Sequence, residues 1–385
     1  MGKTFAQQAT DTLIASVVGL LCVSCVMFGL RQLDPSRIIA SDAKKKKKEL
    51  GRRLGRPIKL NAYEDVIACD VVDSNDINVD FSCVGGLDDV KSALKELVVL
   101  PLKRPDLFMS GKLLRPLKGV LLYGPPGTGK TMLAKAIAKE SEACFINVRF
   151  SNLASKWFGD AQKLVAAVFS LAYKLQPAII FMDEIDSFLG KRGVSSEHEA
   201  TNLMKTEFMA LWDGFNTDAN AQVIVLAATN RPYDLDPAIL RRLPRTFEVG
   251  MPDRSQRAAI LEVLLEGENV EDGIDTHALA DMTEGYSGSD LTEIAKQAAY
   301  LPLRDYLKEF DAVAEEAGSS SRPRAIAFDD LASVIATNKL SKQAAEDYRD
   351  EEAAGNADDG GAVFIDLLRS LSVQQNNSHN QKHNR

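Results

Sequence analysis

The stretch Gly119-Val-Leu-Leu-Tyr-Gly-Pro-Pro-Gly-Thr-Gly-Lys-Thr131 decides the fold, together with Met-Leu-Ala-Lys-Ala-Ile-Ala-Lys139, which follows it. It predicts an apolar strand, a glycine-rich loop of the form GxxxxGK[ST] and a helix, in that order. Glycines let the backbone N–H groups of such a loop surround phosphate oxygens, and the helix adds positive potential at its N-terminus. So short a pattern can arise by chance, but the strand before it and the helix after it are the context that phosphate binding requires.

The loop predicts a binding site for ATP. Lys130 is expected to reach the β- and γ-phosphates, and Thr131 to coordinate Mg²⁺ through its hydroxyl. The predicted nucleotide-binding residues are consecutive: Gly124, Pro125, Pro126, Gly127, Thr128, Gly129, Lys130 and Thr131.

A second predicted strand ends in two carboxylates. The apolar run 178–182 is followed by Asp183 and Glu184, about fifty residues after the glycine-rich loop, as the plan of P-loop ATPases requires. An acidic pair at a strand end is usually only solvated, and it is the spacing from the loop that favours a catalytic interpretation. Asp183 is expected to hold Mg²⁺, directly or through water, and Glu184 to activate the attacking water.

Polar residues also follow the next predicted strand. Asn230 provides an amide that can orient the water or sense the γ-phosphate, and Arg241 and Arg242 come eleven residues later, with Arg245 close behind. Such arginines form either a surface charge cluster or arginine fingers that reach the γ-phosphate of a neighbouring subunit. The finger interpretation implies that activity needs an oligomer.

The pattern of the whole chain predicts an α/β fold with a P-loop domain. From Phe81 to Pro252, apolar runs of strand length alternate with amphipathic helical stretches, which is typical of a parallel sheet with helices on both faces. The predicted strands cover 120–123, 145–148, 179–182 and 223–228. After Pro252 the pattern predicts a small helical lid subdomain, with helices at 255–266, 277–282, 288–309 and 328–337.

The N-terminus predicts a single transmembrane helix. Residues 13–30 are 18 residues without a charge, long enough as a helix to cross the core of a bilayer. Only Lys3 precedes this span among basic residues, whereas Arg31, Arg37 and the lysine run 44–48 follow it, so the positive-inside rule places the rest of the chain in the cytosol. The alternative is a cleaved signal peptide, which has a shorter apolar region after a basic start. We therefore expect a signal anchor held in the lipid bilayer.

Charge is unevenly distributed along the chain. Residues 1–60 carry 12 Lys/Arg and 4 Asp/Glu, and the remainder carries 34 and 50, within a net charge of −8. A basic end on an acidic body indicates a membrane or nucleic-acid contact confined to the N-terminus. Next to an apolar span, the basic residues favour topology and anionic lipid over a nuclear signal or nucleic-acid patch, so no nucleic-acid partner is expected. Five cysteines, an odd number, form no even disulfide framework and favour a reducing compartment.

These features divide the chain into six predicted segments. They are a short non-cytosolic N-terminus (1–12), a transmembrane signal anchor (13–30), a linker or small N-domain (31–80), a large ATPase subdomain (81–253), a helical lid (254–345) and a mostly disordered tail (346–385).

With these motifs in place, more than half of the chain resembles the AAA ATPase family. The segments 80–90 and 285–290 look like the parts of an AAA domain that line the adenine pocket and begin the lid helix. A closer resemblance, to the membrane-anchored AAA extractases of the outer mitochondrial membrane, lies in residues 156–160, 198–201 and 208–214. It implies an ATP-driven homo-hexamer that threads mislocalised tail-anchored proteins out of that membrane, with the peroxisomal membrane as a second location.

The same resemblance implies a substrate pore lined by Trp157, Phe158 and His198. Adjacent aromatics are normally buried in a core, but Lys156 and the Gly159-Asp160 pair beside them favour a loop. Pore aromatics can grip extended polypeptide of almost any sequence, because their rings gain contact area at low cost in entropy. His198 falls in the family's second pore loop, although an exposed histidine is often merely solvated.

One departure from the family and several rival functions are open at this point. Family members commonly place an arginine immediately before the strand aromatic, whereas the order here is Arg245-Thr-Phe247, so the role of Arg245 stays open and the finger role is assigned to Arg241 and Arg242. Microtubule-severing and membrane-remodelling AAA proteins share the core motifs, but usually carry a separate targeting domain. A protease would need an HExxH motif, which is absent, and a non-enzymatic scaffold would tolerate loss of Lys130 and Glu184.

Overall fold

A computed structural model describes residues 46, 48–52, 55, 57–108, 116–148, 161–189, 199–217, 221–313 and 322–337, with the backbone alone at 161, 199–202, 215–217 and 308–313. The chain divides into two compact units between Cys69 and Asp70. In the first, helix α3 (Ala62–Ala68) is capped by Asn61, whose side chain accepts a hydrogen bond from the Glu64 N–H while the Glu64 carboxylate accepts one from the Asn61 N–H.

No helix within the described residues has the length and apolar character needed to cross a membrane. The predicted anchor at 13–30, the pore residues Trp157, Phe158 and His198, and the predicted tail at 346–385 lie outside the described side chains.

The second unit contains a six-stranded sheet in the order β1-β3-β4-β5-β2-β6. Its strands are β1 (Val71–Val72), β2 (Gly119–Tyr123), β3 (Cys144–Val148), β4 (Ala178–Met182), β5 (Val223–Thr229) and β6 (Arg245–Glu248). The four predicted strands β2, β3, β4 and β5 pair in parallel, as predicted, and β6, which was not predicted, pairs in parallel with β2. The edge strand β1 pairs antiparallel with β3, so the sheet is mixed rather than wholly parallel.

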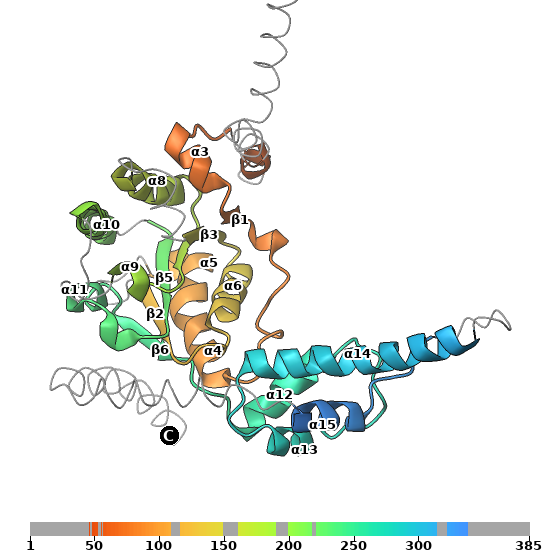
Figure 1. Ribbon diagram of the computed structural model, residues 1–385. Coiled ribbons are helices and arrows are strands. Elements are labelled where there is room, and N and C mark those ends of the chain that lie inside the picture. The colour runs from red at the N-terminus through yellow and green to blue at the C-terminus, as the bar shows by residue number, and fades with distance from the viewer. Residues whose placement is uncertain are drawn as a thin grey trace, which may run out of the picture. The chain divides into compact units, whose positions relative to one another are not determined.

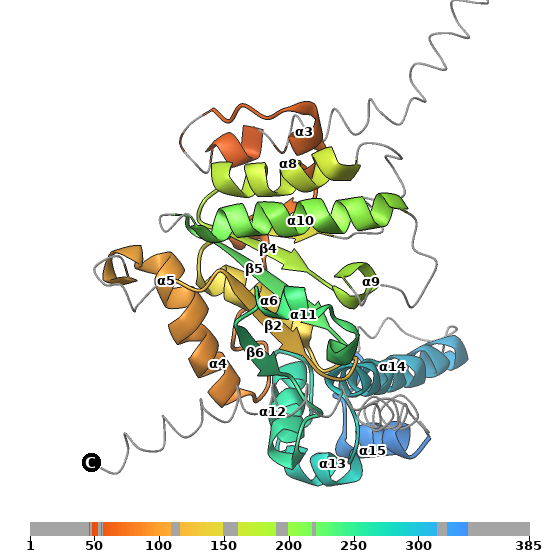
Figure 2. The same ribbon diagram turned by 90° about the vertical axis from the view of Figure 1, so that its left-hand side faces the viewer.

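Helices cover both faces of this sheet (Figures 1 and 2). On one side lie α8 (Ala161–Lys174) and α10 (Glu199–Thr217), which pack against each other, with the short α9 (Asp186–Leu189) and α11 (Pro237–Leu240) nearby. The other side carries α4 (Asp88–Leu94), a π-helical stretch (Lys95–Val99), α5 (Leu100–Lys103) and α6 (Lys130–Glu140). Short 3₁₀ turns occur at Ser74–Asp76, Pro105–Phe108 and Pro232–Asp234.

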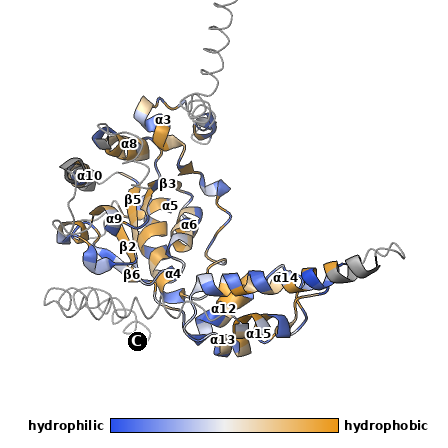
Figure 3. Ribbon diagram, in the orientation of Figure 1, coloured by the Kyte–Doolittle hydropathy of each residue, from blue (hydrophilic) through white to orange (hydrophobic). Residues whose placement is uncertain are grey.

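The core lies along the central strands of the sheet, which are strongly hydrophobic (Figure 3). Every residue of β2, β4 and β5 is buried, which explains why these strands read as continuous apolar runs. Phe145 of β3 stacks on Phe181 of β4 with ring centroids 5.3 Å apart. Between α8 and α10, the ring centroids of Phe169 and Phe208 lie 5.2 Å apart, and within α10 Phe208 packs edge-on against the fully buried Trp212.

Within the described residues, the lid contains four helices: α12 (Arg254–Leu265), α13 (Thr276–Met282), α14 (Gly288–Val313) and α15 (Phe328–Thr337). They enclose a separate apolar core that includes Leu261, Leu279, Leu291 and Leu331. Arg324 ties the loop before α15 to that helix through two hydrogen bonds to Asp330, of 2.5 and 2.8 Å. All four predicted lid helices are confirmed, and α14 continues four residues beyond its predicted end.

Candidate active site

The sheet order brings the predicted site residues to one edge. Strand β5 lies between β4 and β2, and all three run parallel, so their carboxyl ends meet. The glycine-rich loop follows β2, Asp183 and Glu184 follow β4, and Asn230 follows β5. Ligands of open parallel sheets bind at this edge.

Within the loop, Lys130 is buried and its ammonium group is held by backbone carbonyls. Its Nζ donates to the Gly124 oxygen at 2.9 Å and to the Pro125 oxygen at 2.7 Å. Burial lowers the pKa of Lys130 to about 8, against the opposing influence of the Asp183 and Asp186 carboxylates. A cation held beneath the loop in this way is poised to exchange carbonyl oxygens for phosphate oxygens.

Thr131 and Asp183 are directly joined. The Thr131 hydroxyl donates to Asp183 Oδ2 at 2.8 Å, across 52 positions of sequence. A hydroxyl and a carboxylate at this separation are oxygen donors of the kind that Mg²⁺ uses together with substrate phosphates. The residues present therefore fit a magnesium ion bound with nucleotide.

Glu184 is exposed and has an unusual backbone. Its φ of 50° lies in the left-handed region, which a side chain other than glycine rarely adopts. Its N–H donates to Asp183 Oδ1 at 3.1 Å, and the next residue, Ile185, donates its N–H to Ala228 of β5 at 3.0 Å. Strained residues of this kind cluster at functional sites, where the surrounding structure holds them in place.

At the end of β5, side chains connect the strand to α9. The buried Thr229 hydroxyl donates to Asp186 Oδ1 at 2.5 Å and accepts the Arg231 N–H at 2.9 Å. These bonds fix the turn that carries Asn230, which lies between Thr229 and Arg231 in the sequence and is half-buried.

The two candidate finger arginines differ sharply. Arg242 donates to both carboxylate oxygens of Asp213 on α10, at 2.7 Å from Nε, and its Nη1 donates to the Ala238 oxygen at 2.7 Å. This pairing holds the pKa of Asp213 below its usual value. Arg241 is exposed, and its side chain makes no hydrogen bond or ion pair with the residues that the structure describes. Arg245 is half-buried on β6 opposite Val120.

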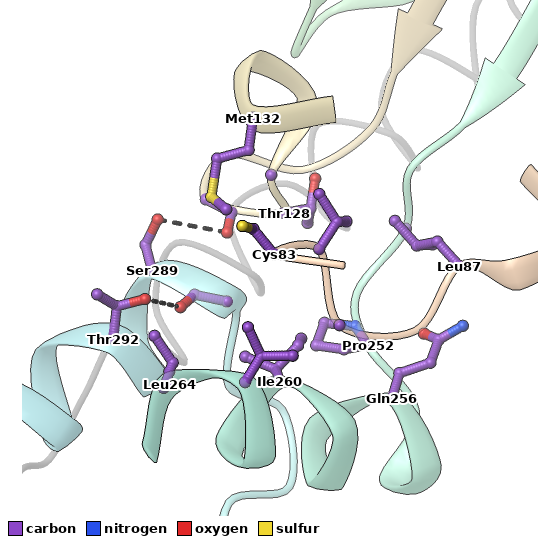
Figure 4. Close-up of a pocket in the computed structure, with 17 residues that line it drawn as sticks. Cys83, Leu87, Thr128, Met132, Pro252, Gln256, Ile260, Leu264, Ser289 and Thr292 are labelled. Carbon is purple, nitrogen blue, oxygen red and sulfur yellow. Dashed lines mark hydrogen bonds between the residues drawn. The ribbon is translucent and has the colours of Figure 1, made fainter. Parts of the chain in front are cut away.

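A cavity of about 280 Å³ lies beside the loop, between the sheet subdomain and the lid. Figure 4 shows Ile260 and Leu264 of α12 lining it with Met132 of α6, and Cys83 and Leu87 of the segment before α4. The lining is mainly apolar, which suits a flat base next to a phosphate loop. The segments 80–90 and 285–290 thus contribute residues to the cavity, as their resemblance to AAA domains implied.

The lid contacts the phosphate loop itself. The Ser289 N–H at the start of α14 donates to the Gly127 oxygen at 3.0 Å, and the Ser289 hydroxyl lies 3.3 Å from the same atom (Figure 4). Gly127 has a φ of 76°, and a Cβ added there would lie 2.7 Å from the Ser287 hydroxyl oxygen. Only glycine permits this approach.

Sequence reasoning missed the contribution of α12 to the cavity. Gln256, Ile260, Val263 and Leu264 line it at helical spacing, but apolar residues at that spacing are the usual signal of a core face. The tie between Arg242 and Asp213 was also missed, because the 29 positions between them carry no pattern that pairs them.

Comparison with known proteins finds an ATPase domain and a lid domain in the part of the chain that forms this site. The AAA family ("ATPase family associated with various cellular activities") matches residues 120–251, and the AAA+ lid domain matches residues 273–316. The human protein named outer mitochondrial transmembrane helix translocase is 47% identical over 331 residues, 86% of this chain and 91% of that protein. A Caenorhabditis elegans protein named mitochondrial sorting homolog is 46% identical over 276 residues, 71% of this chain and 80% of its own length.

Solved structures show the same fold. The crystal structure of the FIGL-1 AAA domain matches with a TM-score of 0.64 at 34% identity, covering 77% of this chain and 96% of that one. The same domain in complex with ADP matches with a TM-score of 0.60 at 35% identity, covering 74% and 92%. The chain therefore belongs to the AAA ATPase family, among the relatives of the outer mitochondrial transmembrane helix translocases, and is a nucleotide-binding enzyme that hydrolyses ATP.

Proposed function

We propose that this enzyme is an ATP-driven extractase that pulls mislocalised tail-anchored proteins from the outer mitochondrial membrane and threads them through a homo-hexameric pore. The observation that carries the proposal is the 47% identity to outer mitochondrial transmembrane helix translocases across 86% of the chain. The peroxisomal membrane is a second proposed location. Microtubule severing and membrane remodelling are the rival functions.

The proposed chemistry uses the residues at the sheet edge. Mg²⁺ supplies charge neutralisation on the phosphates, and Thr131 with Asp183 would hold it. Lys130 binds phosphate oxygens, Glu184 accepts a proton from the attacking water, and Asn230 orients that water. The 2.8 Å contact between Thr131 and Asp183 and the exposure of Glu184 support these roles.

A ring would complete the site. Arginine fingers stabilise the charge that develops during phosphoryl transfer, and they act across a subunit boundary. Arg241 and Arg242 are proposed for that role from the same turn after α11. The exposed guanidinium of Arg241 supports it as the group that reaches the neighbour, while the ion pair of Arg242 supports a part in holding the turn.

Trp157, Phe158 and His198 are proposed to lie in pore loops that grip the polypeptide substrate and move as ATP is hydrolysed. Residues 13–30 would anchor the chain in the lipid bilayer with the ATPase domain in the cytosol. Protease added to intact mitochondria should then digest the ATPase domain. Protection until the outer membrane is ruptured would reverse this topology.

The decisive experiment reconstitutes the full chain in liposomes with a tail-anchored protein and measures ATPase activity, thermal stability and extraction together. The Trp157→Ala/Phe158→Ala double variant should hydrolyse ATP normally but lose extraction, because its loops slip on the polypeptide. Glu184→Gln is the control that should bind ATP and lose both activities. If the aromatics belong to a core, truncation opens cavities costing about 3–5 kcal/mol each, and folding and ATPase activity would fail together. Full extraction by a stable double variant would remove the pore assignment and favour the rival functions.

A further inference from the structure

The outer face of α14 carries a stripe of apolar side chains that are exposed to solvent. Tyr300 is 63% exposed, Leu303 40% and Leu307 52%, and they follow each other at positions i, i+3 and i+7. This spacing puts them on one face of the helix, over two turns. Lys296 and Arg304, one turn to either side of Tyr300, are also exposed. We call these five residues the α14 stripe.

The stripe is not the face that the lid uses for its own core. The core face of α14 is formed by Leu291, Ile294 and Ala298, which are fully buried. They pack with residues of α12 and α15. Large apolar side chains that stay exposed at regular spacing, with basic residues beside them, are typical of a surface that binds another segment.

The chain contains a segment with matching properties beyond α15. Residues 362–373 read Ala-Val-Phe-Ile-Asp-Leu-Leu-Arg-Ser-Leu-Ser-Val, so a helix there would align Phe364, Leu367, Leu368 and Leu371 at the same spacing as the stripe. Just before it, residues 346–359 carry seven Asp/Glu and one Arg. The segment is thus apolar with an acidic stretch on its N-terminal side, whereas the stripe is apolar with Lys296 and Arg304 beside it.

We propose that residues 362–373 of this chain dock on its own α14 stripe as an amphipathic helix, with the acidic residues 346–359 facing Lys296 and Arg304. Helix α15, which packs on α14, ends at Thr337, and the 24 residues before Ala362 span up to about 80 Å when extended, ample for the return. A tethered segment is present at an effective concentration of about millimolar, which favours it over a second chain. Its acidic flank would be repelled by an anionic membrane surface. This contact is independent of the proposed extraction activity.

The test places a photo-crosslinking amino acid at Leu303 of the full chain, in an equal mixture of ¹⁵N-labelled and unlabelled protein, and identifies the crosslinked peptides by mass spectrometry. The same probe at Met282, an exposed residue of α13, is the control. Crosslinks from position 303 to residues 362–373, with both peptides from chains of the same isotope and none from position 282, are the expected result. Mixed-isotope pairs would assign the stripe to a second copy. Crosslinks to other residues or to lipid, or none, would also overturn the proposal.

Two matched substitutions check the orientation of the segment. Leu368→Glu puts a carboxylate on the docking face and should lower the crosslink yield about tenfold, because a buried unpaired charge is strongly disfavoured. Val373→Glu adds the same charge on the opposite face of the helix and should leave the yield nearly unchanged. Equal yields from the two variants would contradict docking through the proposed face.

Discussion

The clearest mechanical test of the nucleotide cavity is Gly85→Ala. Gly85 lines the cavity, and a Cβ there would lie 2.5 Å from the Ile260 Cα and 2.6 Å from its backbone N on α12. Carbon atoms pack at about 3.5 Å or more, so α12 and the segment before α4 must separate by about 1 Å. A side-chain rotation cannot relieve a clash with helix backbone. The lid must therefore move away from the cavity.

The expected cost is that of overpacking, about 1–3 kcal/mol. If nucleotide needs the lid in its present position, the affinity for ADP should fall by about 5–150-fold. A titration with fluorescent ADP measures this, beside a thermal unfolding curve. Gly214→Ala is the matched control, since the added methyl meets no atom within 4 Å. A folded Gly85→Ala protein with unchanged ADP affinity would refute the idea that α12 must pack on Gly85 for nucleotide to bind.

Two further predictions concern charged groups of the site. The pKa of Lys130 is about 8, and bound phosphate would raise it, so above pH 8 nucleotide binding should be accompanied by uptake of a proton. The affinity for ADP should therefore fall as the pH rises from 8. Calorimetry in two buffers with different ionisation enthalpies should show the proton uptake, and Lys130→Arg should abolish it. Arg241→Ala should lower the ATPase rate by about 10³-fold or more without changing thermal stability. Arg242→Ala should lower the ATPase rate too, and should also reduce the free energy of unfolding by about 1 kcal/mol, because Asp213 loses its ion pair. Equal losses of stability in the two variants would contradict the assignment of a structural role to Arg242 alone.

The central strands were readable from the sequence because their environment is uniform. β2, β4 and β5 are covered on both faces, so each shows as an unbroken apolar run ended by glycine, carboxylate or amide. The edge strand β1 has only two residues, too few to show any period. β6 was not among the predicted strands because Arg245 and Glu248 stand at its ends, and its place beside β2 depends on long-range pairing.

The candidate site was readable as residue types, but not as a set of contacts. Spacing placed Lys130, Thr131, Asp183 and Glu184 at strand ends, where a parallel sheet must bring them together. The left-handed backbone of Glu184 has no signature, because glutamate rarely adopts it. The base-sized cavity was out of reach for a different reason: it forms only where α12 meets a segment some 170 positions earlier, Cys83 to Leu87.

The contacts of the phosphate loop explain how nucleotide can act on the lid. Lys130 holds the carbonyls of Gly124 and Pro125, so phosphate oxygens that attract its ammonium group compete with two hydrogen bonds that shape the loop. Two residues after Pro125, the Gly127 carbonyl accepts the Ser289 N–H, which is the first-turn donor of α14. A change of loop shape therefore changes the acceptor that α14 is bonded to. Because α14 packs with α12 and α15 in one apolar core, a shift of α14 would move these lid helices together. Binding or loss of a phosphate group would in this way change the position of the lid.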